Sequence, residues 1–185
     1  MERSDDRPKT GPGELESRPP DQNDLVTVCR ELNRLGVRYM VVGGFAIMAA
    51  GYPRTTGDLD LFVDGSSENE TRLFEALKIL PDQAVRELQP GELGRYPVIR
   101  VADEIVVDVM SRVAGLSFDE AERETIQRQL GDVSIPFASP RLLWRMKSVT
   151  HREKDTADLM FLRQWFAERG ETPPGSERGQ RGLTQ

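Results

Sequence analysis

The spacing of hydrophobic residues along the chain changes between a helical and a strand period, which indicates a mixed α/β domain. Residues 24–35 carry apolar side chains at helical spacing, with Asp24 as the expected N-cap and Gly36 as the stop. The β-branched and aromatic run 37–42 predicts a strand, and the small and apolar residues of 44–50 predict a short helix packed on a sheet.

The pattern continues with a second strand beginning at Asp58 and a helix over 68–80. Two β-rich runs, 96–101 and 104–110, lie on either side of a short turn, which predicts a hairpin. We expect a helical turn near residues 84–88 between them and the preceding helix.

In the last third of the chain, Ser117 is expected to cap a helix through about Leu130. A short strand over 133–137 follows, then a helix starting at Ser139-Pro140 and a last helix starting at Lys154-Asp155. Together these elements predict an α/β (α+β) fold, a small mixed β-sheet flanked by helices and followed by C-terminal helices.

The two ends of the chain have a different composition from its middle. Residues 1–23 and 170–185 are rich in Pro, Gly, Ser and charge and poor in large apolar residues, so we expect disordered tails. One domain is therefore predicted over residues 24–169, with residues 139–169 as its C-terminal helical part.

Composition excludes several classes of protein. Of 185 residues only Cys29 is a cysteine and only His151 is a histidine, which argues against disulfide frameworks, Cys- or His-rich metal sites and a Ser-His-Asp triad. The net charge of −6 argues against a dedicated nucleic-acid-binding domain. The uncharged run 39–52 is too short for a membrane span, and the N-terminus lacks the apolar core of a signal peptide. We expect a cytoplasmic protein that does not contact a membrane.

The stretch with the most chemistry runs from residue 40 to residue 64. Gly43-Gly44 lies between an expected strand and an expected helix, where exposed backbone N–H groups can seat a phosphate. Asp58 and Asp60 are two residues apart on a strand, so both side chains lie on one face, with Cα atoms roughly 6.5 Å apart. Two such carboxylates are costly unless a cation lies between them.

Structural explanations remain open for each of these residues. Asp58 could simply begin a strand after Gly57, and a Gly pair is a common tight turn. Asp108 is a single carboxylate within an apolar strand, and it either points to solvent on an edge strand or adds a third carboxylate to the pair. In the second case the patch repels itself unless it binds a divalent cation such as Mg²⁺.

Two polar segments lie near this stretch in the expected fold. Arg54, Thr55 and Thr56 precede the carboxylates, either as a solvated loop or as contacts for a triphosphate or acceptor. From residue 139 to residue 169 the chain carries seven Lys/Arg and four Asp/Glu, an excess of positive charge that an ordinary solvated helix face would also explain.

These residues in this order resemble a known family. Val42-Gly43-Gly44 followed by Asp58-Leu59-Asp60-Leu61 resembles the signature of the nucleotidyltransferase superfamily, which has the DNA polymerase β-like fold. Lys147 followed by Lys154-Asp155-Thr156-Ala157-Asp158-Leu159 is similar to the C-terminal pattern of AbiEii-type nucleotidyltransferase toxins, although Lys154 stands where those toxins often have Arg. The resemblance covers residues 25–166.

The resemblance implies roles for named residues. Asp58, Asp60 and Asp108 would hold Mg²⁺ or Mn²⁺, and Gly43-Gly44 would seat the phosphates of an NTP. Lys147 would neutralise triphosphate charge, with Lys154, Asp155 and Asp158 completing the nucleotide site. The implied reaction is the transfer of an NMP from an NTP to a hydroxyl of tRNA, a protein or a small molecule.

The resemblance to toxins also suggests a toxin paired with an antitoxin protein. A second hypothesis, from a different class, is a non-catalytic NTP-binding or interaction module on the same fold. In that case no NMP would be transferred.

Overall fold

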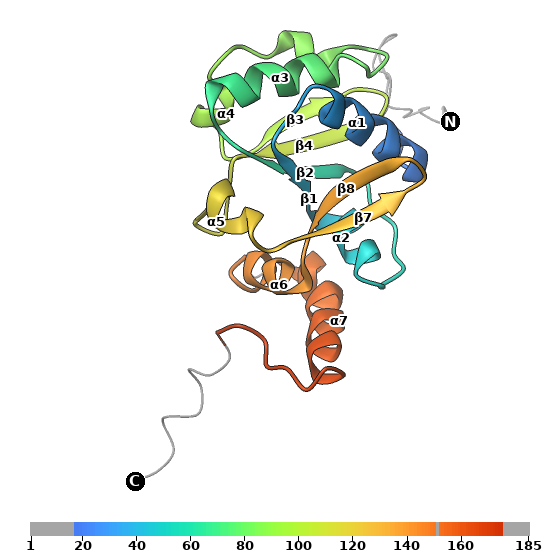
Figure 1. Cartoon of the computed structure of the whole chain (residues 1–185), viewed down its shortest axis with the longest axis vertical. Coiled ribbons are helices and arrows are strands. Elements are labelled where there is room, and N and C mark those ends of the chain that lie inside the picture. The colour runs from blue at the N-terminus through green and yellow to red at the C-terminus, as the bar shows by residue number, and fades with distance from the viewer. Residues whose placement is uncertain (1–16, 151, 176–185) are drawn as a thin grey trace, which may run out of the picture.

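The computed structural model describes residues 17–150 and 152–175. Its centre is a six-stranded mixed sheet with the strand order β3-β4-β2-β1-β8-β7 (Figure 1). The strands are β1 (Tyr39–Val41), β2 (Leu59–Val63), β3 (Ile99–Ala102), β4 (Val106–Met110), β7 (Thr125–Leu130) and β8 (Val133–Ala138). A separate two-stranded hairpin is formed by β5 (Arg112–Val113) and β6 (Leu116–Ser117).

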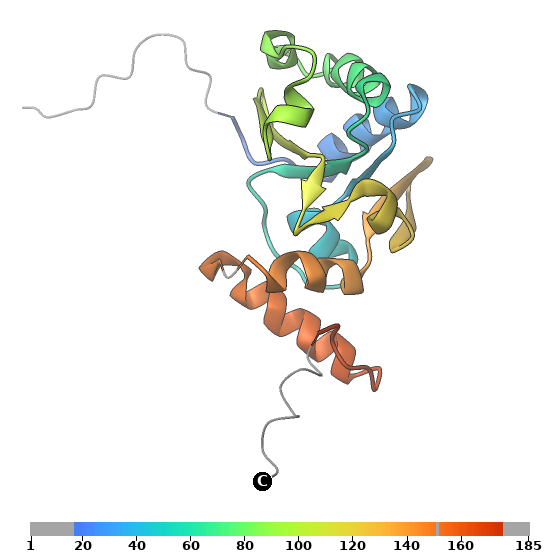
Figure 2. The ribbon, with the colours of Figure 1, turned by 90° about the vertical axis from the view of Figure 1, so that its left-hand side faces the viewer.

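The helices lie on both sides of this sheet. They are α1 (Gln22–Arg34), α2 (Gly43–Ala49), α3 (Ser67–Leu77), α4 (Glu92–Arg95), α5 (Phe118–Glu122), α6 (Pro140–Ser148) and α7 (Thr156–Ala167), with 3₁₀ turns at η1 (Ala84–Glu87) and η2 (Glu153–Asp155). α6 and α7 pack together at the end of the molecule opposite α3, as Figures 1 and 2 both show. The mixed α/β fold class expected from the sequence is confirmed.

The sheet places polar residues of distant segments side by side. β2 and β4 are parallel neighbours, and β3 pairs antiparallel with the other edge of β4. This register sets Asp60 beside Asp108 and Asp108 beside Arg100. The rest of β2 is apolar and completely buried, because the sheet is covered on both faces.

Hydrophobic burial holds this arrangement in place. Phe62, Leu61 and Val63 on β2 are fully buried, as are Leu73 and Leu77 on α3. Each such side chain contributes roughly 1.5–3 kcal/mol by leaving water. The strand that carries the carboxylates is therefore firmly anchored by its apolar neighbours.

One expected helix is wrong. The helix predicted from Ser117 to Leu130 is only the five-residue α5, and the chain then forms β7. Ser117 does cap α5 through a capping box with Glu120. β7 forms because residues 125–130 pair along their whole length with β8, and this tertiary pairing overrides the helical preference of its Gln, Arg and Leu residues.

The ends of the domain also differ from the expectation. α1 begins at Gln22, and Asp21 rather than Asp24 is its N-cap, with Asp24 completing a capping box. Arg18 donates its backbone N–H to Glu104 O at 2.9 Å, and Trp144 Nε1 donates to Pro174 O at 3.1 Å. Segments 17–23 and 170–175 thus contact the domain, whereas residues 1–16 and 176–185 of the predicted tails lie outside the described residues. None of the helices in the described ranges has the length and apolar character needed to cross a membrane.

Candidate functional site

Three carboxylates converge where β2 and β4 lie side by side. Asp58 directly precedes β2, Asp60 is its second residue, and Asp108 is the central residue of β4. One carboxylate oxygen from each lies within 4.8 Å of the other two. Asp108 is only 7% exposed, so it does not point to solvent from an edge strand.

The three carboxylates disfavour one another's charge. Burial raises the pKa of Asp60 to about 6, and the neighbouring charges of Asp58 and Asp108 act in the same direction. Lys147 and Lys154 offset part of this shift. A divalent cation would relieve the repulsion, and since carboxylate oxygens are the ligands that Mg²⁺ and Ca²⁺ prefer, the residues present fit such an ion.

Two glycines leave room for this cluster. Gly43 has a φ of +58°, and a Cβ at this position would lie 1.8 Å from Asp60 Oδ2. A Cβ at Gly44 would lie 2.4 Å from Thr56 Oγ1. Gly43 and Gly44 therefore do more than form a turn. Asp60 and Thr56 occupy the space that side chains at these two positions would need. Thr56 in turn donates its hydroxyl to Asp58 Oδ1 at 3.2 Å.

Arg100 covers the third carboxylate. Its Nε donates to Asp108 Oδ1 at 2.8 Å and its Nη2 donates to Oδ2 at 2.7 Å, a bidentate pair between cross-strand partners. The same Nη2 is 3.8 Å from Asp58 Oδ2. The hydrogen bonds to Asp108 raise the pKa of Arg100 above its ordinary value, so the guanidinium is permanently charged.

No motif in the sequence singles out Arg100. It belongs to the hairpin that the sequence does predict, and it alternates with the buried Ile99 and Val101. The two-residue turn 102–103 that the sequence suggests would pair Arg100 with Ile105, whereas the observed turn over 103–105 pairs it with Asp108. The length of that turn, which sets the register, could not be read from the residues.

Lys147 lies in a buried ion network rather than free in the site. Its Nζ is 2.6 Å from Asp155 Oδ1 and 2.9 Å from Asp158 Oδ2, and Arg54 Nη1 is 2.6 Å from the same Asp158 oxygen. Thr150 donates its hydroxyl to Asp155 at 3.0 Å. Burial raises the pKa of Asp155, but the hydrogen bond and charge of Lys147, with smaller contributions from Thr150 and Arg152, together outweigh burial and hold that pKa below its ordinary value.

A cavity of about 200 Å³ opens over the carboxylates. Nine of the twelve residues expected at the site line it: Gly43, Gly44, Arg54, Asp58, Asp60, Asp108, Lys147, Lys154 and Asp155. The other three do not. Thr55 is exposed beside a different cavity, Thr56 reaches the site only through Asp58, and Asp158 is 1% exposed beneath Lys147 and Arg54.

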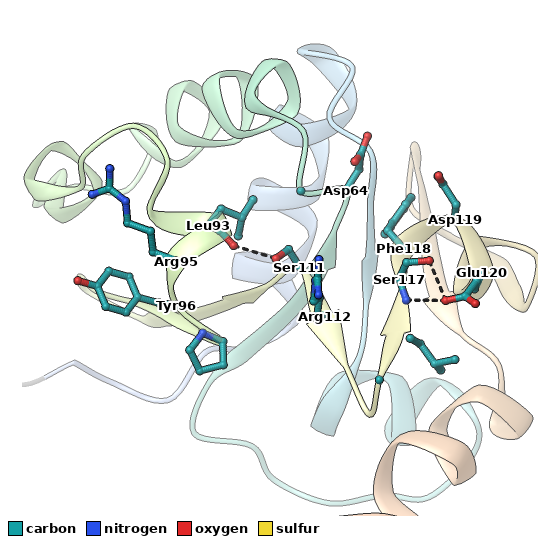
Figure 3. Close-up of a pocket in the computed structure, with 15 residues that line it drawn as sticks. Asp64, Leu93, Arg95, Tyr96, Ser111, Arg112, Ser117, Phe118, Asp119 and Glu120 are labelled. Atoms are coloured by element: carbon teal, nitrogen blue, oxygen red, sulfur yellow. Dashed lines mark hydrogen bonds between the residues drawn. The ribbon is translucent and has the colours of Figure 1, made fainter.

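A second cavity of about 830 Å³ lies next to the first. Figure 3 shows Ser111 and Arg112 in its middle, between Arg95 and Tyr96 on one side and Phe118, Asp119 and Glu120 on the other. At three places, two consecutive residues line different cavities. The residue that lines the second cavity and the residue that lines the first are Pro97 and Val98, Ser111 and Met110, and Arg112 and Val113. The two cavities are therefore adjacent along these segments of chain.

Comparison with known proteins leaves the family open. No protein-family model matches the chain, and no curated protein matches it. One solved structure that does match is the 1.87 Å crystal structure of a Thermotoga maritima protein provisionally named a nucleotidyltransferase. The two chains are 16% identical, the match covers 80% of this chain and 92% of that chain, and the TM-score is 0.47. So distant a likeness assigns neither family nor activity to this protein.

Proposed function

We propose that this protein is a Mg²⁺-dependent nucleotidyltransferase, which moves an NMP from an NTP to a hydroxyl and releases pyrophosphate. The observation that carries the proposal is the convergence of Asp58, Asp60 and Asp108 within 4.8 Å of one another on adjacent strands. A purely structural role gives no reason to gather three mutually repelling carboxylates beside an open cavity.

The proposed roles follow from where each residue lies. Asp58 and Asp60 hold the divalent cation, and Asp108 lies beside them as the third carboxylate. When bound, the cation supplies charge neutralisation for the triphosphate and lowers the pKa of an attacking hydroxyl. Gly43 and Gly44 keep the wall of the cavity free of side chains, so that phosphate oxygens can approach the carboxylates closely.

The basic residues divide into two kinds. Lys154 is exposed, lines the cavity and acts electrostatically on Asp60, so we assign it to the triphosphate. Lys147 and Arg54 also line the cavity, but their charges are balanced by Asp155 and Asp158. We therefore propose that the main role of Lys147 and Arg54 is to hold the cavity wall together. Their attraction for phosphate is weaker than that of Lys154. Asp155 and Asp158 hold these two cations in place.

The acceptor is proposed to bind in the second cavity. At about 830 Å³ it has the volume of a typical small-ligand site, whereas the cavity over the carboxylates is smaller than such sites usually are. Arg95 and Arg112 line it without an ion pair in the described part of the chain, and Tyr96 is 55% exposed. For transfer to occur, the hydroxyl of an acceptor there must extend past Val98, Met110 and Val113 to reach the α-phosphate over the carboxylates.

Toxin activity and an antitoxin partner remain a hypothesis that rests on the resemblance to AbiEii-type toxins alone. Expression of the wild-type chain and of Asp58→Asn/Asp60→Asn in a bacterial host would test it. Arrested growth with the wild type only would support a toxin. Normal growth with both would remove the reason to expect an antitoxin.

The proposed transfer can be tested without knowing the acceptor. Each of the four NTPs, labelled with ³²P at the α-phosphate, would be incubated with the protein, Mg²⁺ and a cell extract separated into RNA, protein and small-molecule fractions. We expect label in one fraction, with Asp58→Asn/Asp60→Asn giving none. If no fraction is labelled while an NTP still binds, the non-catalytic NTP-binding module becomes the better account.

A further inference from the structure

Arg100 occupies the place where a cation would meet the third carboxylate. Both oxygens of Asp108 accept hydrogen bonds from its guanidinium, at 2.8 and 2.7 Å, and its Nη2 is 3.8 Å from Asp58. The planar fork of an arginine matches a carboxylate in this bidentate way, whereas a lysine would bind as a point charge. A metal ion that bound Asp108 would share these oxygens with the guanidinium, whose fixed positive charge opposes the approach of a further cation.

The backbone keeps Arg100 at this place. Arg100 and Asp108 are direct cross-strand partners in the antiparallel pair of β3 and β4, and Ile99 and Val101 on either side of Arg100 are buried. The Arg100 side chain is 62% exposed and that of Asp108 is 10% exposed, so the guanidinium reaches the carboxylate from the solvent side. The contact therefore lies on the solvent-exposed side of the carboxylate cluster.

The charges of the cluster are balanced by one divalent cation. Three carboxylates carry three negative charges, and Arg100 cancels one of them. A single divalent cation neutralises the remaining two, whereas two divalent cations would leave an excess of two positive charges. The neighbouring Lys147, Arg54, Asp155 and Asp158 are two cations and two anions and cancel one another. Lys154 and Arg152 also line the cavity, and their positive charges further disfavour a second metal ion.

In two-metal sites, a pair of divalent cations stabilises both the attacking and the leaving oxygen of the transfer reaction. We propose that in this protein Arg100 takes the place of one of these two metal ions. The site holds one divalent cation, on Asp58 and Asp60, and the guanidinium of Arg100 supplies the second positive charge at Asp108. Fixed arginine charges stabilise phosphoryl transfer in other enzymes, so the chemistry is available to this side chain. The inference rests on the proposed function, because it concerns the same carboxylates.

The test is the number of Mn²⁺ ions bound per chain, measured by electron paramagnetic resonance and by calorimetric titration. It is made with Mn²⁺ alone and with an unreactive α,β-methylene NTP analogue. We expect one Mn²⁺ per wild-type chain under both conditions. Arg100→Met should bind two, because Asp108 is then free. Arg86→Met is the matched control, since Arg86 is exposed on η1 and forms no ion pair in the described ranges, and it should bind one.

The outcomes separate this inference from the proposed function. Two Mn²⁺ ions on the wild-type chain would overturn the inference and leave the nucleotidyltransferase proposal intact. A single Mn²⁺ on a folded Arg100→Met would overturn it as well. No Mn²⁺ on the wild type would contradict the metal site itself. Arg100→Gln, which keeps one hydrogen-bond donor toward Asp108, is the second variant if Arg100→Met does not fold.

Discussion

Asp60 and Asp108 face each other as register partners on the parallel strands β2 and β4, although 48 positions separate them in the numbering. Asp58 precedes the same strand as Asp60, so two segments of chain supply the whole acidic cluster. The fold therefore fixes the separation of the carboxylates by backbone pairing, the most rigid means available. Such rigidity suits a site whose ligands must be held against their own repulsion.

The position of Gly43 gives a first prediction. Gly43→Ala should lower the free energy of unfolding by about 2 kcal/mol, because the residue has a positive φ and the added methyl collides with Asp60. Mn²⁺ affinity should fall at least about tenfold, a change of about 1.4 kcal/mol, since Asp60 must move. Calorimetric titration and urea denaturation measure the two effects. Gly57→Ala is the control, because no atom lies within 4 Å of its added Cβ.

The raised pKa of Asp60 predicts a pH-dependent stability. The folded protein holds a proton on Asp60 up to about pH 6, whereas the unfolded chain releases it near the ordinary value of 3.8. The contribution of this group to stability is therefore full below pH 4 and is lost as pH rises toward 6. In a metal chelator, Asp60→Asn should be more stable than the wild type at pH 7, by at most about 3 kcal/mol.

The difference between Asp60→Asn and the wild type should shrink as pH falls from 7 to 4 in the chelator. Urea denaturation at each pH gives the two free energies. Asp82→Asn is the control, since Asp82 is exposed and its side chain has no described partner. A difference that stays constant across this range would contradict the assigned cause.

The ion network under the cavity gives a third prediction. Lys147→Met leaves the buried Asp155 without its cation, so the free energy of unfolding should fall by about 3 kcal/mol in the absence of any nucleotide. Adding Asp155→Asn should restore part of this loss. Lys78→Met, at the C-cap of α3, removes a half-exposed lysine that pairs with Glu75 and should cost less than about 0.5 kcal/mol. An unchanged stability of Lys147→Met would instead leave Lys147 free to bind phosphate.

The second cavity gives a prediction about the acceptor. Arg112→Ala should reduce transfer of α-phosphate label to the acceptor fraction, because Arg112 lines that cavity, and should leave NTP binding unchanged. Label transfer and NTP-induced thermal shift are measured on the same preparations. Equal label transfer by Arg112→Ala and by the control Arg86→Ala would place the acceptor elsewhere.

The sequence predicted the elements around the carboxylates well, because the signals for these elements lie in neighbouring residues. Runs of apolar and β-branched residues indicated β2 and β4, and a carboxylate within each run singled out Asp60 and Asp108. Ser139-Pro140 likewise gave the start of α6, where Ser139 accepts a hydrogen bond from Leu142 N at 3.2 Å. Each of these signals lies within a few residues of the feature it predicts.

The features that the sequence did not predict depend on distant partners. β7 is a strand because β8 pairs with it, and Arg100 meets Asp108 because of the hairpin register. Asp158 was expected at the nucleotide, but it is buried under Arg54 from a loop 104 positions away. Charge and spacing alone cannot distinguish a side chain that meets a ligand from one that meets another side chain.

The most direct test of the account is the binding of nucleotide at the carboxylates. Thermal unfolding would be recorded with each of the four NTPs, with and without Mg²⁺, for the wild type and for Asp58→Asn/Asp60→Asn. An NTP at 100 times its dissociation constant stabilises the folded state by about 2.7 kcal/mol. We expect a Mg²⁺-dependent shift with at least one NTP, and we expect the double variant to lose it. No shift with any NTP, or an equal shift in a folded double variant, would contradict it.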